Sequence, residues 1–356
     1  MIETAGEIRA YVSSAGTKEV LQFALDPSKG SLHDVGATPV PGPAGPSPTS
    51  MPMALRPDRK RLYVVVRTSP YPVTSFALED STGRPRMLAT AELPGAMAYL
   101  STDRSGRYLF GASYVSAMLS LSAIDEEGRV AGPAIQTLAT PPKAHSIIAD
   151  PANRWIFAAI LGADILLQLR FDAAHGRIEP GSPPVPARPG CGPRHLVFHP
   201  NRPVLYAVNE LDASVTVYAV DGEQGRLREL QSLPMLAPGG PVPPSAADVH
   251  LTPDGRFLYA SERTTHCLVS FAVDPDSGRL ERLGAHATEP SPRGFAISPC
   301  GRFLLAAGQL SNHLALHAID PRDGRLALLA RRPAGQNPNW IEFVAASTDP
   351  APSAGY

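Results

Sequence analysis

The sequence predicts an all-β protein, a seven-bladed β-propeller with four antiparallel strands in each blade. Three observations lead to this prediction. One strand–turn–strand pattern recurs along the whole chain, its copies are spaced by about fifty residues, and an unpaired strand pattern closes the C-terminus. Such a period, filled with short strands and turns, is typical of propellers. The 39 prolines and 30 glycines suit a protein with many turns.

Six copies of the pattern are complete. In each, an apolar run is reversed by a Pro-Asp-Gly-like turn, as at 253–255, and a second strand follows. A third strand with alternating apolar and polar residues, such as LVSFAVD, then leads through a turn to an outer fourth strand. The complete copies occupy 55–66, 100–113, 149–160, 198–210, 251–263 and 297–309, and a shortened seventh, EIRAYVSS, opens the chain.

The two ends of the chain are expected to close the ring. The first copy lacks an inner strand, and the closing segment NPNWIEFVA at 337–345 has the pattern of an inner strand without a blade. Pairing the two would leave no open sheet edge at the seam. The Pro/Gly-rich stretches 39–48, 179–190 and 233–245 are expected to be loops rather than linkers. The prediction is a single domain over residues 1–346 with a disordered tail over 347–356.

The composition of the chain limits the kinds of partner that the protein is expected to bind. The formal net charge is -1, so there is no electrostatic case for nucleic acid or for an anionic membrane surface. No apolar stretch approaches the roughly 18 residues of a membrane span. The three cysteines, Cys191, Cys267 and Cys300, match no zinc or redox spacing, and the N-terminus lacks the pattern of a secretory signal. These features favour a cytoplasmic protein without a metal or cofactor, and none indicates its oligomeric state.

Strand topology sorts the polar residues onto two rims. The starts of the inner strands and the loops between second and third strands lie on one side, called here the mouth rim; the other two kinds of turn lie on the turn rim. Taken singly, loop arginines and glutamates are mostly solvated, and a histidine on an inner strand is often structural. Convergence of many such groups at one concavity nevertheless predicts a ligand site. The mouth rim gathers His145, Arg194, His195, Glu210, His250, Glu262, Arg263, Arg293, Gln309 and Asn339, with Lys143 beside them.

At these residues the sequence resembles a known family. The segments GPRHLVFHP, NELDASVTVY, AADVHLTPDGRFLYASERT, PRGFAISPCGRFLLAAGQ and NPNWIEFV, in this order on consecutive blades, resemble the propeller-type bacterial 6-phosphogluconolactonases. That family is related to the cycloisomerases that lactonise carboxy-cis,cis-muconate. The resemblance covers essentially the whole chain and implies metal-independent hydrolysis of a sugar-acid δ-lactone, most simply 6-phosphoglucono-1,5-lactone in the pentose phosphate pathway.

The resemblance also implies a catalytic set. In the cycloisomerase branch this set is one histidine, two arginines and one glutamate, and the matching positions are His145, Arg194, Glu210 and Arg263, with Arg293 a rival for the last. Lactone opening needs an activated water, a counter-charge for the oxyanion and a proton for the leaving alkoxide. Glu210 or His145 would move the proton, Arg194 would bind the carbonyl, and Arg263 and Arg293 would clamp an anionic group. The other mouth-rim residues, His195, His250, Glu262, Arg293, Gln309, Asn339 and Lys143, form the expected substrate-binding set.

Three alternatives stay open. The substrate could be a lactone that carries a carboxylate, such as an aldarate lactone, because the same arginines would serve. The reaction could be that of a muconate-type cycloisomerase. The protein could also be a non-catalytic scaffold, as many propellers are, although a polar arginine-lined mouth is less typical of a protein-binding rim than an aromatic cluster. The small anionic lactone is therefore the expected partner.

Overall fold

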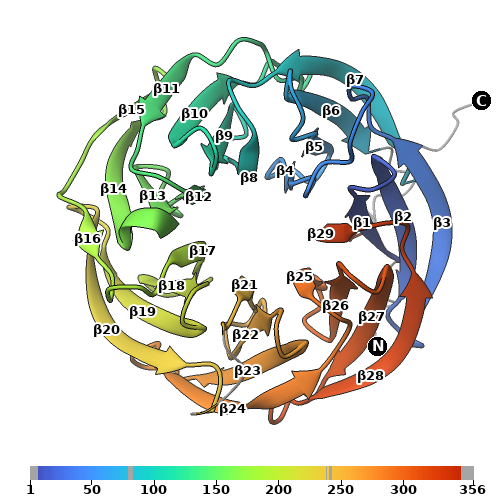
Figure 1. The fold of residues 1–356 in the computed structure, drawn as a ribbon. Coiled ribbons are helices and arrows are strands. Elements are labelled where there is room, and N and C mark those ends of the chain that lie inside the picture. Colours follow the sequence, from blue (N-terminus) through green and yellow to red (C-terminus); the bar gives the residue numbers. More distant parts are fainter. Residues whose placement is uncertain (1–6, 79–82, 238, 240–242, 346–356) are drawn as a thin grey trace, which may run out of the picture.

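The computed structural model describes residues 7–78, 83–237, 239 and 243–345. Their strands form seven separate antiparallel sheets arranged around a central axis, which confirms the seven-bladed propeller (Figure 1). The inner strands of successive blades contact one another around the whole ring. The expected tail at 347–356 lies outside the described residues, and the single domain over 1–346 stays a prediction.

Each blade runs from an inner strand at the axis to an outer strand at the perimeter (Figure 1). Numbered in chain order from the N-terminus, the blades contain the following strands. Blade 1 has β29 (Pro338–Ala345), β1 (Ile8–Ser14), β2 (Glu19–Asp26) and β3 (Ser31–Pro39); blade 2 has β4 (Met53–Leu55), β5 (Arg61–Val65), β6 (Pro72–Leu78) and β7 (Pro85–Glu92); blade 3 has β8 (Met97–Thr102), β9 (Tyr108–Ser113), β10 (Met118–Ala123) and β11 (Gln136–Ala139).

The remaining blades repeat the arrangement. Blade 4 has β12 (Ala144–Ala149), β13 (Trp155–Ile160), β14 (Ile165–Asp172) and β15 (Arg177–Pro180), with a short 3-10 helix η1 (Leu161–Ala163); blade 5 has β17 (Pro193–Phe198), β18 (Val204–Asn209), β19 (Ser214–Asp221) and β20 (Arg226–Pro234); blade 6 has β21 (Ala246–Leu251), β22 (Phe257–Glu262), β23 (Cys267–Val273) and β24 (Leu280–Ala287); blade 7 has β25 (Pro292–Ile297), β26 (Phe303–Gly308), β27 (His313–Ile319) and β28 (Leu326–Pro333).

The seam closes as the sequence predicts. β29 pairs antiparallel with β1, with Ile341 opposite Val12 and Phe343 opposite Ala10. Blade 1 is thus built from both ends of the described chain, and the axis-facing edge of β1 is paired rather than left open.

One expectation about the blades is wrong in detail. Residues 179–190, expected to be a loop, contain a further short strand, β16 (Val185–Pro186), which pairs with β14. The sheet of blade 4 therefore has five strands rather than four. β15 pairs with only one end of β14, so the other end is free to take a second partner.

Buried tyrosines of the repeat join blades 2, 5 and 6 to the blades that follow them. The hydroxyl of Tyr63 donates to the carbonyl of Gly128 at 3.1 Å, and the hydroxyl of Tyr206 donates to Gly278 at 2.8 Å. Tyr259 makes the same bond to Gly324 at 2.8 Å. Each accepting glycine sits in the turn between the third and fourth strands, in the left-handed region that favours glycine. Where the repeat has a tyrosine at this position, it thus supplies both partners of a blade-to-blade contact.

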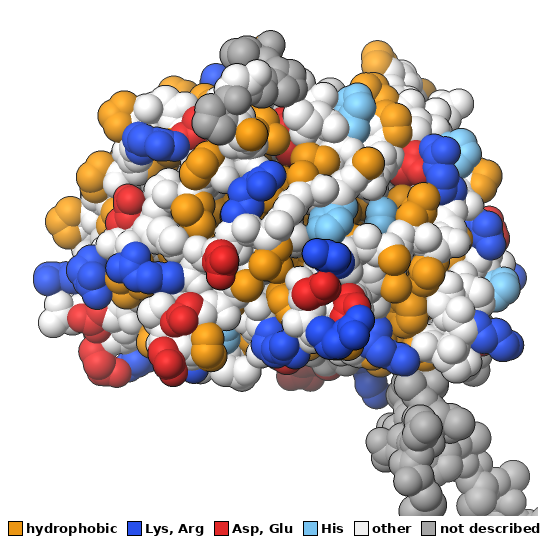
Figure 2. Space-filling view, turned by 90° about the horizontal axis from the view of Figure 1, so that it is seen from below, with side chains coloured by type: hydrophobic (Ala, Val, Ile, Leu, Met, Phe, Trp, Pro, Cys, Tyr) orange, Lys and Arg blue, Asp and Glu red, His pale blue; other side chains and the backbone are white. Residues whose placement is uncertain are grey.

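The side of the ring seen in Figure 2 shows no dominant charge. Seen from the side of the ring, basic and acidic side chains lie beside each other with hydrophobic ones between them (Figure 2). This mixture agrees with the formal net charge of -1. Within the described residues, no helix is long and apolar enough to cross a membrane.

Candidate active site

β-Bulges at the starts of three inner strands direct side chains into the mouth of the propeller. In β17, Pro193 lies opposite Asn209 and His195 opposite Val208, so Arg194 is the extra residue. The same shift leaves out His145 in β12 and Arg293 in β25. A bulge turns the extra side chain away from its regular face, and bulges are frequent beside active sites. The same shift at the start of β29 leaves out Asn339, so four of the predicted site residues share one backbone feature.

Local sequence explains where these bulges form. The residue two positions before each bulged side chain has a positive φ: 66° at Lys143, 63° at Gly192 and 55° at Ser291. Proline follows Gly192 and Ser291 and fixes the backbone at the next position. Lys143 therefore serves as a turn residue, and its ammonium lies over the ring of Tyr114 at 5.8 Å from the centroid.

The loops that leave the second strands supply the other side chains. Glu210 and Arg263 directly follow β18 and β22, and Arg67 follows the end of β5 by two residues. Together with the bulged residues they surround a cavity of about 300 Å³, called here the mouth cavity. Its lining is Thr49, Arg67, Ala98, Tyr114, Val115, His145, Arg194, Glu210, Arg263 and Arg293. The structure therefore brings the four predicted catalytic residues and Arg293 into one place.

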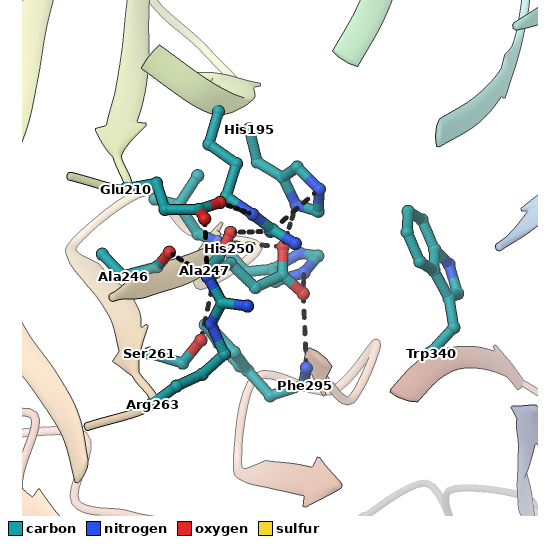
Figure 3. Close-up of polar contacts among 12 residues, drawn as sticks. His195, Glu210, Ala246, Ala247, His250, Ser261, Arg263, Phe295 and Trp340 are labelled. Atoms are coloured by element: carbon teal, nitrogen blue, oxygen red, sulfur yellow. Dashed lines mark hydrogen bonds and ion pairs between the residues drawn. The ribbon is translucent and has the colours of Figure 1, made fainter. Parts of the chain in front are cut away.

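Glu210 is held by two guanidinium groups. One carboxylate oxygen accepts from Nε of Arg194 at 2.8 Å, and the other lies 3.1 Å from Nη2 of Arg263 (Figure 3). Burial by itself would raise the pKa of Glu210, but the two arginines outweigh it and lower the pKa below its ordinary value. Glu210 is thus ionised, with both oxygens engaged.

Backbone carbonyls fix the two arginines that hold Glu210. Nη1 of Arg194 donates to the carbonyl of Ala247, and Nε of Arg263 donates to the carbonyl of Ser245 at 3.1 Å. Nη2 of Arg194 has no hydrogen-bond partner among the described residues, so it is available to a ligand. Burial, reinforced by the charge of Arg263, lowers the pKa of Arg194 to about 10, which leaves it charged at neutral pH.

The mouth cavity has an excess of positive charge. Four guanidinium groups line it, against one carboxylate. Burial and the repulsion of Arg194, Arg263 and Arg67 lower the pKa of Arg293 to about 9. Like charges are brought together in this way at a cost to stability, and such clusters are typical of functional sites that bind the opposite charge.

His145 is a buried imidazole without a hydrogen bond. Its side chain is 4% exposed, and its Nδ1 has no partner within the described part of the chain. Burial, followed by the positive charge of Arg194, lowers its pKa well below the ordinary value, so the ring is neutral at pH 7. The rings of Tyr114 and His195 contact it edge-on, with centroids 5.8 and 5.2 Å away. A neutral imidazole with a free nitrogen can accept a proton.

His195 connects Arg194 to a buried carboxylate. Its Nε2 lies 3.1 Å from Nη1 of Arg194, which can only donate, and its Nδ1 lies 2.8 Å from Oδ1 of Asp248. A neutral ring that carries its proton on Nδ1 satisfies both contacts. Burial and Arg194 lower the pKa of His195 to about 4, in agreement with that form. Asp248 in turn lies 3.2 Å from Nε2 of His250.

A layer of aromatic rings separates the mouth cavity from a second one. Tyr99, His195 and Trp340 come from three inner strands and pack with centroids 4.9 to 5.7 Å apart. Figure 3 shows Trp340 across the axis from His195. Beyond them a cavity of about 680 Å³ extends toward the turn rim. His195 and His250 line this axial cavity rather than the mouth cavity.

Four other residues of the expected substrate-binding set do not line the mouth cavity. Glu262 is fully buried and accepts from the backbone N–H of Ser245 and of Thr265, so it fixes its own loop. Asn339 is 1% exposed and accepts from the N–H of Met51 at 3.0 Å. Gln309 donates to the carbonyl of Thr49 at 3.3 Å. Lys143 has the turn role given above.

The sequence interpretation missed Arg67 and the part played by Asp248. Arg67 lies in the loop RTSPYP, which the strand topology already places on the mouth rim, so its position was readable from the repeat. The signal for Asp248 is weaker. A carboxylate on an inner strand can pair with any neighbour, and only the folded structure shows that Asp248 contacts both His195 and His250.

No group of three or more His, Cys, Asp or Glu side chains in the described ranges could hold a metal ion.

Comparisons with known proteins agree on one family. The family model described as "Lactonase, 7-bladed beta-propeller" matches residues 9–343. The chain is 38% identical over 335 residues to a 6-phosphogluconolactonase of Pectobacterium carotovorum, covering 94% of this chain and 98% of the relative. It is 37% identical over 337 residues to a 6-phosphogluconolactonase of Yersinia pestis, with the same coverage. Among solved structures, the periplasmic gluconolactonase of Pseudomonas aeruginosa is similar, with a TM-score of 0.85 and 30% identity, over 96% of this chain and all of that one.

Proposed function

The chain belongs to the seven-bladed β-propeller lactonase family, and we propose that it hydrolyses 6-phosphoglucono-1,5-lactone to 6-phosphogluconate. The observation that carries the proposal is the mouth cavity, where a neutral imidazole whose Nδ1 has no partner in the described structure lies among four guanidinium groups. The two curated relatives named above, both 6-phosphogluconolactonases, support the same substrate.

His145 is the proposed proton carrier. Glu210 is a poor candidate, because both of its oxygens are engaged by Arg194 and Arg263 and its pKa is lowered. Neutral His145 would remove a proton from water as the water oxygen attacks C1 of the lactone. The resulting imidazolium would return that proton to the ring oxygen as the C1–O5 bond breaks, so one lactone and one water give one hydroxy acid.

Arg194 is proposed to stabilise the oxyanion. Its Nη2 has no partner among the described residues, while its Nε and Nη1 are fixed by Glu210 and by the carbonyl of Ala247. A donor fixed in advance and aimed at the developing charge is the commonest large contribution to acyl-transfer catalysis. Glu210 and Arg263 would act through Arg194, by holding its guanidinium plane in one orientation.

The similar gluconolactonase of Pseudomonas aeruginosa supports a second candidate, hydrolysis of unphosphorylated glucono-1,5-lactone. The same chemistry at C1 would serve both lactones, and they differ only in whether the far end carries a phosphate. For the phosphorylated substrate we propose a cytoplasmic place of action, which the scarcity of cysteine supports.

Direct hydrolysis tests the proposal. Freshly prepared 6-phosphoglucono-1,5-lactone is mixed with purified protein, and acid release is followed by pH-stat above the spontaneous rate, with and without EDTA. We expect rapid hydrolysis that the chelator does not change. A His145→Gln protein purified in parallel reports any lactonase carried over from the expression host. Rates equal to the spontaneous rate for both the phosphorylated and the unphosphorylated lactone would contradict the proposal.

A further inference from the structure

Two of the four arginines in the mouth cavity are not used by Glu210. Arg194 and Arg263, from blades 5 and 6, bind that carboxylate. Arg293 comes from the start of β25 in blade 7, and Arg67 from the loop after β5 in blade 2. Blade 1 lies between these two blades, across the ring from the blade of His145 (Figure 1). The cavity therefore has a proton-transfer side and a second, purely cationic side.

Both arginines on this second side have unused donors. Arg293 makes no hydrogen bond or ion pair with any residue that the structure describes, although it lines the mouth cavity. Arg67 donates from Nη1 to the hydroxyls of Thr49 at 3.2 Å and Ser50 at 2.9 Å. Its Nε is buried without a partner among the described residues. Buried guanidinium N–H groups without acceptors are costly unless a ligand supplies the acceptors.

Arg67 is held in place from the seam of the propeller. Asn339, on the closing strand β29, accepts from the N–H of Met51, which fixes the segment that follows the two hydroxyls. Gln309 and Asn337 donate to the carbonyl of Thr49 at 3.3 and 3.4 Å. The segment whose two hydroxyls accept from Nη1 of Arg67 is thus itself anchored by side chains near the ends of blades 7 and 1, while Nε of Arg67 keeps its donor unused among the described residues.

We propose that Arg67 and Arg293 form a subsite for a phosphate monoester dianion, and that this subsite selects phosphorylated lactones over unphosphorylated ones. Two uncompensated guanidinium charges match a dianion better than a single carboxylate, and guanidinium groups bind phosphate oxygens through pairs of N–H donors. This proposal rests on the proposed function, because it assumes that a lactone carbonyl occupies the side of Arg194 and His145.

The test compares Arg67→Gln with the wild-type protein on two substrates that differ only in the phosphate. For 6-phosphoglucono-1,5-lactone we expect kcat/KM to fall by about 10- to 100-fold, mostly through KM, as for loss of a hydrogen bond to a charged group. For glucono-1,5-lactone we expect a change of no more than about twofold, because that substrate has no group at the subsite. Arg293→Gln is expected to show the same selectivity, so the test does not depend on one variant.

Arg188→Gln is the matched control. Arg188 lies on the same rim, in the stretch before β17, but it pairs with Asp212 and does not line the mouth cavity. Its substitution removes one positive charge near the mouth without touching the subsite, so both substrates are expected to keep their wild-type kinetics. Equal losses on both substrates in Arg67→Gln, or the same selective loss in Arg188→Gln, would overturn the proposal.

Binding of the product keeps this proposal separate from the proposed function. Calorimetric titration with 6-phosphogluconate and with gluconate needs no turnover, so it reports on the subsite even if neither lactone is hydrolysed. Preference of the wild-type protein for the phosphorylated acid, lost in Arg67→Gln, is the expected result. Equal affinity of the wild-type protein for the two acids would overturn the subsite whatever the hydrolysis assay shows.

Discussion

The two rims of the propeller differ in how far their polar groups are hydrogen-bonded. On the turn rim, carboxylates are satisfied by the turns that contain them: Asp103 accepts from the N–H groups of Arg107 and Tyr108 at 2.8 and 2.9 Å. On the mouth rim, His145 and Arg293 make no hydrogen bond to the described residues, and guanidinium groups face one another. The same backbone repeat thus carries self-sufficient turns at one end and unsatisfied groups at the other.

This difference separates stability from function. A turn that satisfies its own aspartate strengthens the blade and leaves nothing for a ligand. A buried imidazole without a partner and a cluster of like charges weaken the fold, and they are retained where a ligand completes them. Substitutions on the two rims are therefore expected to change different measured quantities, which makes the comparison testable.

The largest expected effect is on turnover, in His145→Gln. Removal of a positioned acid–base group lowers kcat by about 10²- to 10⁴-fold. Because Nδ1 of His145 has no partner in the described structure, the melting temperature is expected to stay at the wild-type value or to rise. Stopped-flow or pH-stat kinetics and thermal unfolding of the same preparation measure both quantities.

His33→Gln serves as the control for that experiment. His33 is exposed on the outer strand β3, far from the axis, and its ring lies within hydrogen-bond distance of the hydroxyl of Ser31. Wild-type turnover is expected for it. A His145→Gln protein that keeps wild-type kcat would remove His145 from the mechanism.

The second prediction concerns the turn rim. In Asp150→Ala the N–H groups of Arg154 and Trp155 lose the acceptor that they share at 2.7 Å. Loss of acceptors for partly buried N–H groups costs about 1 to 3 kcal/mol each. We expect urea unfolding to show a loss of that order, while kcat and KM stay unchanged because Asp150 does not line the mouth cavity.

Asp150→Asn sharpens this prediction. An asparagine keeps one oxygen in the position of the accepting Oδ1, so most of the lost stability should return. If Asp150→Ala instead lowers kcat while the unfolding free energy stays the same, the two rims do not divide stability and function as described.

The fold could be predicted from the sequence because the blades share one sequence pattern. The blade number, the order of strands and the pairing of β29 with β1 all follow from it. The bulges at the starts of the inner strands, among them those at His145, Arg194 and Arg293, were not predicted although they recur in six blades, because a register shift belongs to the backbone pairing and leaves no mark in the pattern of polar and apolar residues. For the same reason β16 was not foreseen within a proline-rich stretch.

The candidate site was readable in part. Strand topology places residues on a rim, but it does not say which way a side chain turns once it is there. Glu262 is on the correct rim and bonds back to its own loop, whereas Arg67 on the same rim faces the cavity. Such choices depend on competing local donors and acceptors, here the N–H and hydroxyl of Thr265, which only the folded chain brings into range.

The smallest expected effect is a pH dependence of product binding, which belongs to the mouth rim alone. Burial and the neighbouring Arg194, Arg263 and Arg67 lower the pKa of Arg293 to about 9, and Glu210 opposes them only in part. The protonated guanidinium binds the phosphate, so affinity for 6-phosphogluconate has its full value well below pH 9. Above pH 9 the affinity falls by about tenfold per pH unit, because binding requires one proton on Arg293. The phosphate is already a dianion at pH 7, so its own charge does not change over this range.

Calorimetric titrations from pH 7 to 10 measure the fall. In Arg293→Gln the affinity should be lower at pH 7 and nearly flat to pH 10. A wild-type affinity that stays constant to pH 10, or a fall that persists unchanged in Arg293→Gln, would show that crowding of charge at the mouth does not control anion binding.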